Sequence, residues 1–379
     1  MSAADRVTRR LQSLDDGLSA GAACAGPMPF GDGRYSIRVA NDMESRRKAY
    51  GLVYRLYLEK EYAKPHPARM WLSVFDALPE TVTLLVERTA VEGGGGKVEG
   101  AGAAGQKSST LHPPPSTNSA VPSTPVGALT VVFDSPLGLP ADRLYKPELD
   151  ALRAKGRRLS EIVSLGVAED SGAGSEMLVK LFNFVYLVAK KIRGATDFVI
   201  TVNPRHVRFY EKTLLFEPAG PERECDKVGG APALLLRLDL DVPEERVRME
   251  HGPAERRPPR ARTLYPMFVA PAGEPALVAG LAASLRPMTW REFGRFFVAE
   301  TDILARATRE QRAFIRERYA VVNATDREQE AVVTLPRAAA TLAICDADRK
   351  ELSRQEDVAA GSEIGLKLEP FGVRVLLER

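Results

Sequence analysis

Two buried strand patterns flank one amphipathic segment in the middle of the chain, and this arrangement restricts the fold more than any other feature. The runs "RLSEIVSLGVA" (158–168) and "TDFVITV" (196–202) are rich in β-branched and aliphatic residues, which is typical of strands. From 175 to 193, apolar residues recur at the spacing of one helix face. A strand, a helix and a second strand predict a strand-helix-strand unit at the centre of a mixed α/β sheet.

Further elements are expected on both sides of this unit. Asn41 or Asp42 can cap a helix that runs to about residue 62, and Pro204 suits the first position of a short helix that follows the strand at 196–202. Another short helix is expected at 148–156. The remaining strands are expected at 34–40, 81–87, 127–133, 214–218 and 231–240.

Three breaks in composition divide the chain. Residues 1–33 form a polar arm of small residues, and the charged, Pro-rich residues 241–263 have the composition of a linker. Residues 91–126 are Gly-, Ala-, Ser- and Pro-rich and cannot bury enough apolar area to offset the entropy of ordering, so a disordered insertion is expected there. The breaks define one domain at 34–240 and a second unit at 264–379, which is helical first and then rich in short strands.

The bulk properties exclude several classes of protein. Hydrophobic residues make up 44% and charged residues 27% of the chain, a balance that allows a full core. A net charge of only +3 gives no support to nucleic-acid binding. The 3 cysteines and 4 histidines are scattered, so neither a disulfide framework nor a metal site is expected. Prolines interrupt the most apolar window, 267–285, so we expect no transmembrane segment and a cytoplasmic protein.

Several longer motifs occur in a recognisable order across residues 34–240. They are "YLEKEYAKPHP", "LPETVTLLVE", "DSPLGLPADRLYKPELDALRAKGRRLSEIVSLGV" and "VNPRHVRFYEK". With these motifs the chain resembles the GNAT superfamily of N-acyltransferases, and more narrowly the N-acyl amino acid synthases, which are relatives of the acyl-homoserine-lactone synthases. The resemblance implies a GNAT-like mixed central sheet flanked by helices. Residues 320–379 loosely resemble the small antiparallel β modules that are appended to starch-degrading enzymes.

The resemblance implies an acyl transfer. The α-amine of an amino acid attacks a long-chain acyl thioester, and no cofactor is permanently bound. The thioester is carried by the phosphopantetheine of acyl carrier protein, or by coenzyme A as acyl-CoA. Glu161 is the candidate base and Tyr210 the candidate phenol that faces the departing thiolate. Glu161 would equally serve as a strand-end carboxylate paired with Arg157 or Arg158.

The same resemblance implies the residues that would contact the acyl donor and its carrier. Acidic Glu169 and Asp170 disfavour a coenzyme A pyrophosphate, whereas the single phosphodiester of a carrier suffers less repulsion. His206 also fits an ordinary residue at the start of a helix, and the arginines also fit a solvated surface. The candidate donor-binding residues are Leu165, Gly166, Val167, Gly172, Gly174, Asn203 and His206, and the candidate docking residues for an acidic carrier are Arg157, Arg158, Arg205 and Arg208.

Two other functions fit part of the sequence. Ser164 stands where the family usually has an arginine, which allows a catalytically weak protein that binds acyl groups or their carrier. A small-molecule N-acetyltransferase that uses acetyl-CoA is the other alternative. The acceptor amino acid, the acyl chain length and the oligomeric state are not predicted by the sequence.

Overall fold

The structure is a computed structural model of the 379-residue chain. It describes residues 27–30, 33–89, 123–169, 174–225, 230–253, 255, 263–316, 320–322, 329–334, 339–345, 351–359, 363–368 and 373–378. Most of the predicted N-terminal arm and residues 90–122 of the predicted insertion lie outside the described residues. The predicted strands on either side of that insertion pair with each other in antiparallel register, as a hairpin connection requires.

A nine-stranded sheet forms the centre of the described part of the chain, with the strand order β1-β2-β3-β4-β5-β6-β9-β7 and β8 paired to β9. Its only parallel neighbours are β5 and β6; the other pairs are antiparallel. This confirms the predicted mixed α/β fold. The strands are β1 (Met28–Phe30), β2 (Tyr35–Val39), β3 (Val82–Thr89), β4 (Ser123–Phe133), β5 (Leu159–Val167), β6 (Asp197–Val202), β7 (Glu217–Pro218), β8 (Arg223–Cys225) and β9 (Ala231–Asp239).

Several strand boundaries differ from the sequence-based expectation, two of them inside the expected breaks in composition. Strand β1 lies inside the predicted arm, because Phe30 packs against Tyr35 with ring centroids 5.4 Å apart. Strand β4 begins at Ser123, four residues before the predicted start, because Ser123 donates a 2.7 Å hydrogen bond to the buried Glu87 of β3.

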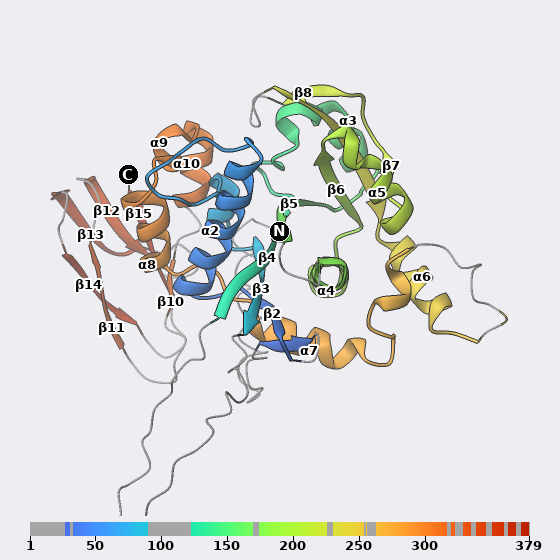
Figure 1. The fold of residues 1–379 in the computed structure, drawn as a ribbon. Helices are drawn as coiled ribbons and strands as arrows, with labels where there is room; N and C mark the ends of the chain where they lie inside the picture. Colours follow the sequence, from blue (N-terminus) through green and yellow to red (C-terminus); the bar gives the residue numbers. More distant parts are fainter. Residues whose placement is uncertain are drawn as a thin grey trace, which may run out of the picture.

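Helices cover both faces of the sheet (Figure 1). On one face lie α2 (Met43–Glu59) and α3 (Asp142–Ala154), whose apolar residues pack on β3, β4, β5 and β9. On the other face lie α4 (Gly174–Tyr186), its π-helical continuation η3 (Leu187–Ile192) and α5 (Pro204–Leu214). Asp42 caps α2 in a capping box with Ser45, so the sequence itself defines where this helix begins.

Helix α6 (Asp241–Glu250) occupies the first part of the segment whose composition predicted a linker. Val247, one turn from its end, is 1% exposed and belongs to the main core. A charged, Pro-rich composition does not prevent a helix that buries one apolar face, since proline is tolerated in the first turn.

The segment 263–316 contributes to the same cores as the sheet. Helix α8 (Trp290–Phe293) and the π-helical η7 (Gly294–Ala299) lie beside α2 (Figure 1), where Phe296 is fully buried against Tyr50. The carboxylate of Glu292 lies 2.8 Å from the guanidinium of Arg46 on α2. The other helices here are η6 (Tyr265–Met267), α7 (Glu274–Ser284), α9 (Ile303–Arg306) and α10 (Arg309–Arg316).

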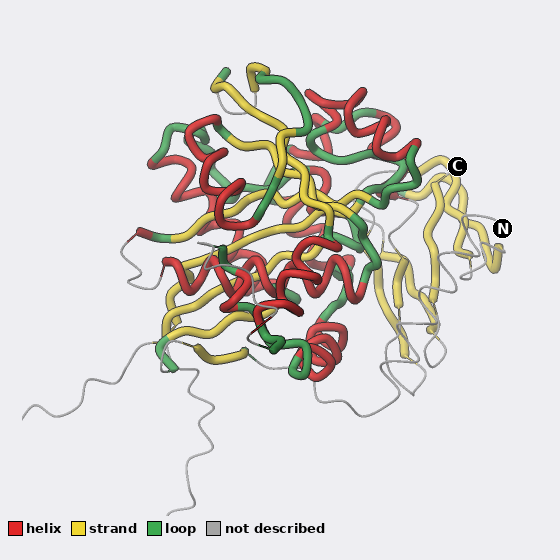
Figure 2. The backbone as a smooth tube through the Cα atoms, turned by 90° about the vertical axis from the view of Figure 1, so that its right-hand side faces the viewer, coloured by secondary structure: helices red, strands yellow, loops and turns green. Residues whose placement is uncertain are grey.

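The strands towards the C-terminus form two further antiparallel sheets, with the orders β10-β15-β12-β13 and β11-β14. Figure 2 shows these strands beside the larger body, in which helices lie above and below the central sheet. No helix of the described residues combines the length and the apolar character that crossing a membrane would demand. The strands are β10 (Ala320–Val322), β11 (Gln329–Thr334), β12 (Ala339–Cys345), β13 (Glu351–Val358), β14 (Glu363–Leu368) and β15 (Val373–Glu378).

Candidate active site

Strands β5 and β6 separate halfway along their length and leave an opening in the central sheet. Their parallel pairing covers only three residue pairs, from Leu159 opposite Asp197 to Glu161 opposite Val199. Beyond this point β5 stays paired with β4 as far as Val167, and β6 stays paired with β9 as far as Val202. The backbone edges that face the opening are therefore available to a ligand that runs between the two strands.

A β-bulge distorts β5 beside this opening. Thr130 of β4 pairs with Val163 and Ala128 pairs with Gly166, so two residues of β5, Ser164 and Leu165, oppose one residue of β4. Ser164 has φ of +53°, the left-handed region that costs a residue with a side chain on the order of 1 kcal/mol. Such strain is typical of functional sites, and a bulge redirects backbone N–H groups. No residue of "SEIVSLGV" predicts this bulge, because glycine is absent from the strained position.

Helix α2 forms one wall of the opening. A Cβ atom at Gly166 would lie only 2.9 Å from Cδ1 of Leu56, so the glycine lets the last turn of α2 approach the strand. The next residue, Tyr57, stacks edge-on against Trp71, with ring centroids 4.9 Å apart, and against Tyr62 at 5.9 Å. The end of α2 therefore presents an aromatic cluster next to β5.

Helix α5 forms the opposite wall. Asn203 caps this helix, and its side chain accepts a hydrogen bond from the backbone N–H of Arg205 at 3.2 Å. Tyr210 packs edge-on against Phe182, Phe209 and Phe216. Desolvation raises the pKa of Tyr210 to about 12, so its hydroxyl remains protonated at neutral pH and can donate a hydrogen bond.

Arg205 connects the two walls at the outer end of the opening. Its guanidinium donates to the hydroxyl of Tyr62 and, through Nε, to Nε2 of His206 at 3.0 Å. Desolvation and then the charges of Arg205 and Lys60 lower the pKa of His206, which favours the neutral ring that accepts this bond. The Nε2 atom of His206 thus accepts a hydrogen bond from the neighbouring Arg205.

Glu161 lies at the closed end of the opening, on the last parallel rung. Its side chain is buried, and Oε2 accepts a 2.7 Å hydrogen bond from the backbone N–H of Ala141, just before α3. The structure thus gives Glu161 an anchoring contact that was not expected from the sequence. Of the two arginines expected near it, Arg157 binds Asp197 and Asp239.

The four arginines predicted as docking residues do not lie on a single face. Arg157 lies 2.5 Å from Asp197 and 2.6 Å from Asp239, and the hydrogen bond to Asp197 raises its pKa. Arg157 and Arg158 precede β5, whereas Arg205 and Arg208 follow β6. Because β5 and β6 are parallel, the starts and ends of these strands lie at opposite edges of the sheet. Arg157 and Arg158 therefore lie at one edge of the sheet, and Arg205 and Arg208 lie at the other.

The glycines after β5 are only partly placed. Gly172 lies outside the described residues, and Gly174 begins α4 with open space where a Cβ atom would stand. Leu165 and Val167, by contrast, pack partly buried against the main core at the edge of the opening.

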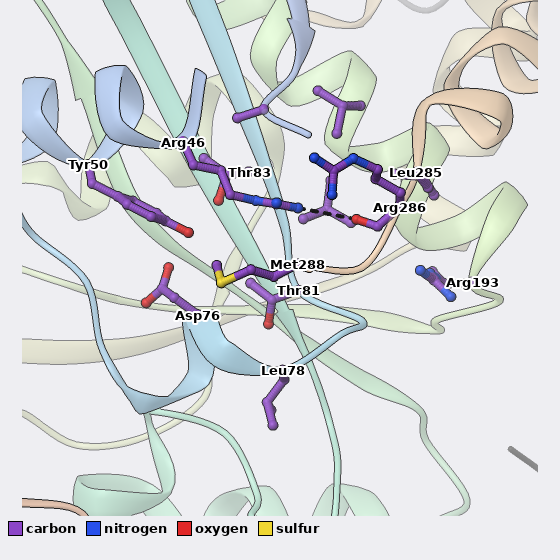
Figure 3. A pocket seen from close by; sticks show the side chains of 13 residues that line it. Arg46, Tyr50, Asp76, Leu78, Thr81, Thr83, Arg193, Leu285, Arg286 and Met288 are labelled. Carbon is purple, nitrogen blue, oxygen red and sulfur yellow. Dashed lines mark hydrogen bonds between the residues drawn. The ribbon is translucent and has the colours of Figure 1, made fainter. Parts of the chain in front are cut away.

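A polar cavity lies elsewhere, under the first turns of α2 (Figure 3). Its lining includes Arg46, Tyr50, Asp76, Thr83 and Arg286. The cavity volume is about 10 Å³, which is room for about one water molecule. It is too small for an amino acid or an acyl chain. Among the described residues, no group of His, Cys, Asp and Glu side chains is arranged to hold a metal ion.

Comparison with known proteins identifies the segment that builds the opening. Residues 120–239 match the family model of the N-acyl amino acid synthase FeeM. This FeeM-like segment runs from β4 to β9 and includes both strands of the opening and the α5 wall. The match agrees with the resemblance that the sequence motifs suggest, and it covers the part of the mixed sheet that contains the opening. No curated protein matches the chain.

Solved structures to which the chain is similar include FeeM from uncultured soil microbes, which is 22% identical, covers 55% of this chain and 92% of its own, and has a TM-score of 0.40. The AHL synthase LasI is 12% identical, with coverages of 57% and 91% and a TM-score of 0.37. A putative N-acetyltransferase from Lactobacillus plantarum is 14% identical, with coverages of 55% and 99% and a TM-score of 0.31.

Proposed function

We propose that the protein transfers a long-chain acyl group from the phosphopantetheine thioester of acyl carrier protein to the α-amine of an amino acid. The observation that supports this most directly is the bulged, unpaired edge of β5 inside a segment that matches an N-acyl amino acid synthase. A pantetheine arm carries amide groups that pair with such an edge as an added strand would. The exposed carboxylate of Glu169 at the end of β5 favours a carrier-bound donor over the pyrophosphate of coenzyme A.

In this proposal each group along the opening has a role. The thioester lies beside Ser164 and Leu165, where a backbone N–H polarises the carbonyl. Glu161 accepts one proton of the ammonium group, and the resulting amine attacks the thioester. The C–N bond forms, the C–S bond breaks, and a second proton passes from the nitrogen to the departing thiolate. Tyr210 donates a hydrogen bond to the departing sulfur. Arg205 and Arg208, on α5, meet the acidic carrier near the mouth of the opening.

The direct test is product formation. The full-length protein is incubated with palmitoyl carrier protein, palmitoyl-CoA or acetyl-CoA, each with the twenty amino acids, and N-acyl products are measured by mass spectrometry. We expect N-palmitoyl amino acids, formed fastest from the carrier. Binding of acyl carrier without any product would support the acyl-binding alternative, and faster turnover of acetyl-CoA would support an acetyltransferase.

The variant Glu161→Gln should distinguish a role of Glu161 as the base from its role as the hydrogen-bond acceptor for the backbone N–H of Ala141. A glutamine has the same shape and its amide oxygen can still accept from Ala141, but it is not a base. If Glu161 is the base, the rate should fall by about 10²- to 10⁴-fold while the melting temperature changes little. An unchanged rate would leave Glu161 with the anchoring contact alone.

The backbone strain at Ser164 yields a matched pair of variants. Ser164→Gly should keep the bulge and raise the free energy of unfolding by up to about 1 kcal/mol, because glycine adopts positive φ without a Cβ clash. Ser164→Val should flatten the bulge or destabilise the strand, because β-branched residues resist this conformation. We expect the rate of acyl transfer to stay within about twofold for the glycine variant and to fall at least tenfold for valine. Equal rates in the two variants would rule out a role for the bulge.

A further inference from the structure

We propose that Tyr57 contacts the substrate, with its hydroxyl donating a hydrogen bond to the thioester group of the bound acyl donor from the side opposite Tyr210. This inference rests on the proposed function and adds to it a donor from outside the FeeM-like segment, which begins at residue 120. Tyr57 is the first residue of the motif "YLEKEYAKPHP", and the sequence alone assigned it no role.

The first support is the position of Tyr57 in the last turns of α2. Its neighbour Leu56 lies directly on Gly166, two residues beyond the strained Ser164 of β5. This close approach brings the helix to the strand at the level where β5 and β6 have separated. Tyr57 is therefore part of the wall of the opening.

The second support is that the Tyr57 side chain is fixed by contacts of its ring, which leave its hydroxyl group available. Trp71 and Tyr62 fix the ring by edge-on contacts at 4.9 and 5.9 Å, and the backbone N–H of Trp71 donates to Tyr50, which fixes the tryptophan to the same helix. In the described part of the chain, the Tyr57 hydroxyl has no hydrogen-bond partner. A half-buried phenol usually finds one, so the missing partner is expected to be a ligand atom.

The third support is the relation of Tyr57 to Tyr210. Desolvation raises the pKa of Tyr57, and the proximity of Tyr210 and then Tyr62 raises it further. Tyr210 comes from α5, across the opening, and the Arg205–Tyr62 contact joins α5 to the turn that follows α2. In the described residues the Tyr210 hydroxyl also has no protein partner. Two protonated phenols thus lie on opposite walls of the opening.

The chemistry defines what Tyr57 can do. A phenol with a raised pKa is a donor at neutral pH and cannot serve as the base. When the amine attacks, negative charge develops on the thioester oxygen, and a donor fixed beforehand stabilises this charge more than it stabilises the bound thioester. Tyr57 donates without losing its proton, while the C–N bond forms, the C–S bond breaks and sulfur takes a proton.

The test compares two phenylalanine variants of the full-length protein. Tyr57→Phe keeps the ring contacts with Trp71 and Tyr62 and removes only the hydroxyl. We expect kcat with palmitoyl carrier protein to fall by about 10²-fold, with the KM for the amino acid and the melting temperature nearly unchanged. Tyr54→Phe is the control, because the Tyr54 hydroxyl on the same helix accepts from the backbone N–H of His66 at 2.8 Å. It should lower the melting temperature and leave kcat unchanged.

A double-mutant cycle with Tyr210→Phe then asks whether both phenols act on one group. We expect the combined loss to differ from the product of the single losses, because both hydroxyls contact the same thioester. Wild-type kcat and KM in Tyr57→Phe would overturn the inference.

If the wild-type protein forms no product with any donor, the proposed function fails. In that case the dissociation constant of palmitoyl-CoA tests the proposed contact of Tyr57 with the acyl donor independently of catalysis. Weaker binding by Tyr57→Phe than by Tyr54→Phe would retain the contact, and equal binding would overturn it.

Discussion

Replacing Glu292 by alanine should lower the free energy of unfolding by about 3–5 kcal/mol, the usual cost of removing one partner from a buried ion pair. Glu292 is 3% exposed and Arg46, its partner on α2, is 6% exposed. The same carboxylate accepts two 2.9 Å hydrogen bonds from Arg286 and one of 2.7 Å from the backbone N–H of Thr289. The alanine variant leaves Arg46 buried without its counter-ion. Urea unfolding measures the effect.

The matched control removes both charges. In Arg46→Met combined with Glu292→Leu, no buried charge remains, so most of the lost stability should return. If Glu292→Ala lowered the free energy of unfolding by less than about 1 kcal/mol, the Arg46–Glu292 pair would behave like an ion pair exposed to solvent. Activity at low temperature should survive in both, since neither residue lies at the opening.

The contribution of Glu292 should also depend on pH. Burial by itself raises the pKa of Glu292, but hydrogen bonds from Arg286 and the charge of Arg46 outweigh it, so the pKa is lowered on folding. A lowered pKa contributes stability above the unfolded value, about 4.3, and this stability is lost as the pH falls through the folded value. The difference between the wild type and Glu292→Gln should therefore narrow below about pH 4.

Ending the chain after residue 263 should prevent the acyltransferase domain from folding. The removed segment supplies Phe293, Phe296 and Phe297, each at most 5% exposed, to the core beneath α2 and α3. Losing one buried phenylalanine costs about 3–5 kcal/mol, and a domain has about 5–15 kcal/mol in total. We expect aggregated protein and no thermal unfolding transition.

Ending the chain after residue 319 is the control. This chain keeps every helix from α7 to α10 and lacks strands β10 to β15. We expect it to keep the melting transition of the central sheet and its acyl transfer activity. If the chain that ends after residue 263 were as stable as the full-length protein, folding would not need the segment 264–316. Its buried phenylalanines would then contribute little to the free energy of unfolding.

The sequence was most informative where the local pattern and the tertiary fold agree. The alternation of apolar residues located β5, β6 and α4 to within a few residues, and Asn203 with Pro204 located the start of α5. Helix α6 was missed because only Val247 and Pro243 are buried, which is too little for a periodic signal.

The details of the candidate site were less predictable, because they depend on contacts between distant segments. The bulge at Ser164 is imposed by the register with β4, and no local preference indicates it. Arg157 looked like a docking residue, but Asp197 and Asp239 bind it from β6 and β9. Tyr57 was an ordinary helical tyrosine until Trp71, Tyr62 and the α5 wall surrounded it.

The contacts between α2 and the segment after residue 284 can form only after the ribosome has made both, so α2 is made long before its packing partners. Arg46 donates to the carbonyl of Arg286, 240 residues further along the chain. At about 5–20 residues per second, a ribosome needs roughly 12–50 s to make that stretch. Throughout this time Arg46 has no counter-ion and the apolar face beneath α2 and α3 is uncovered. We therefore expect the newly made chain to expose this apolar face until Glu292 and Phe296 emerge.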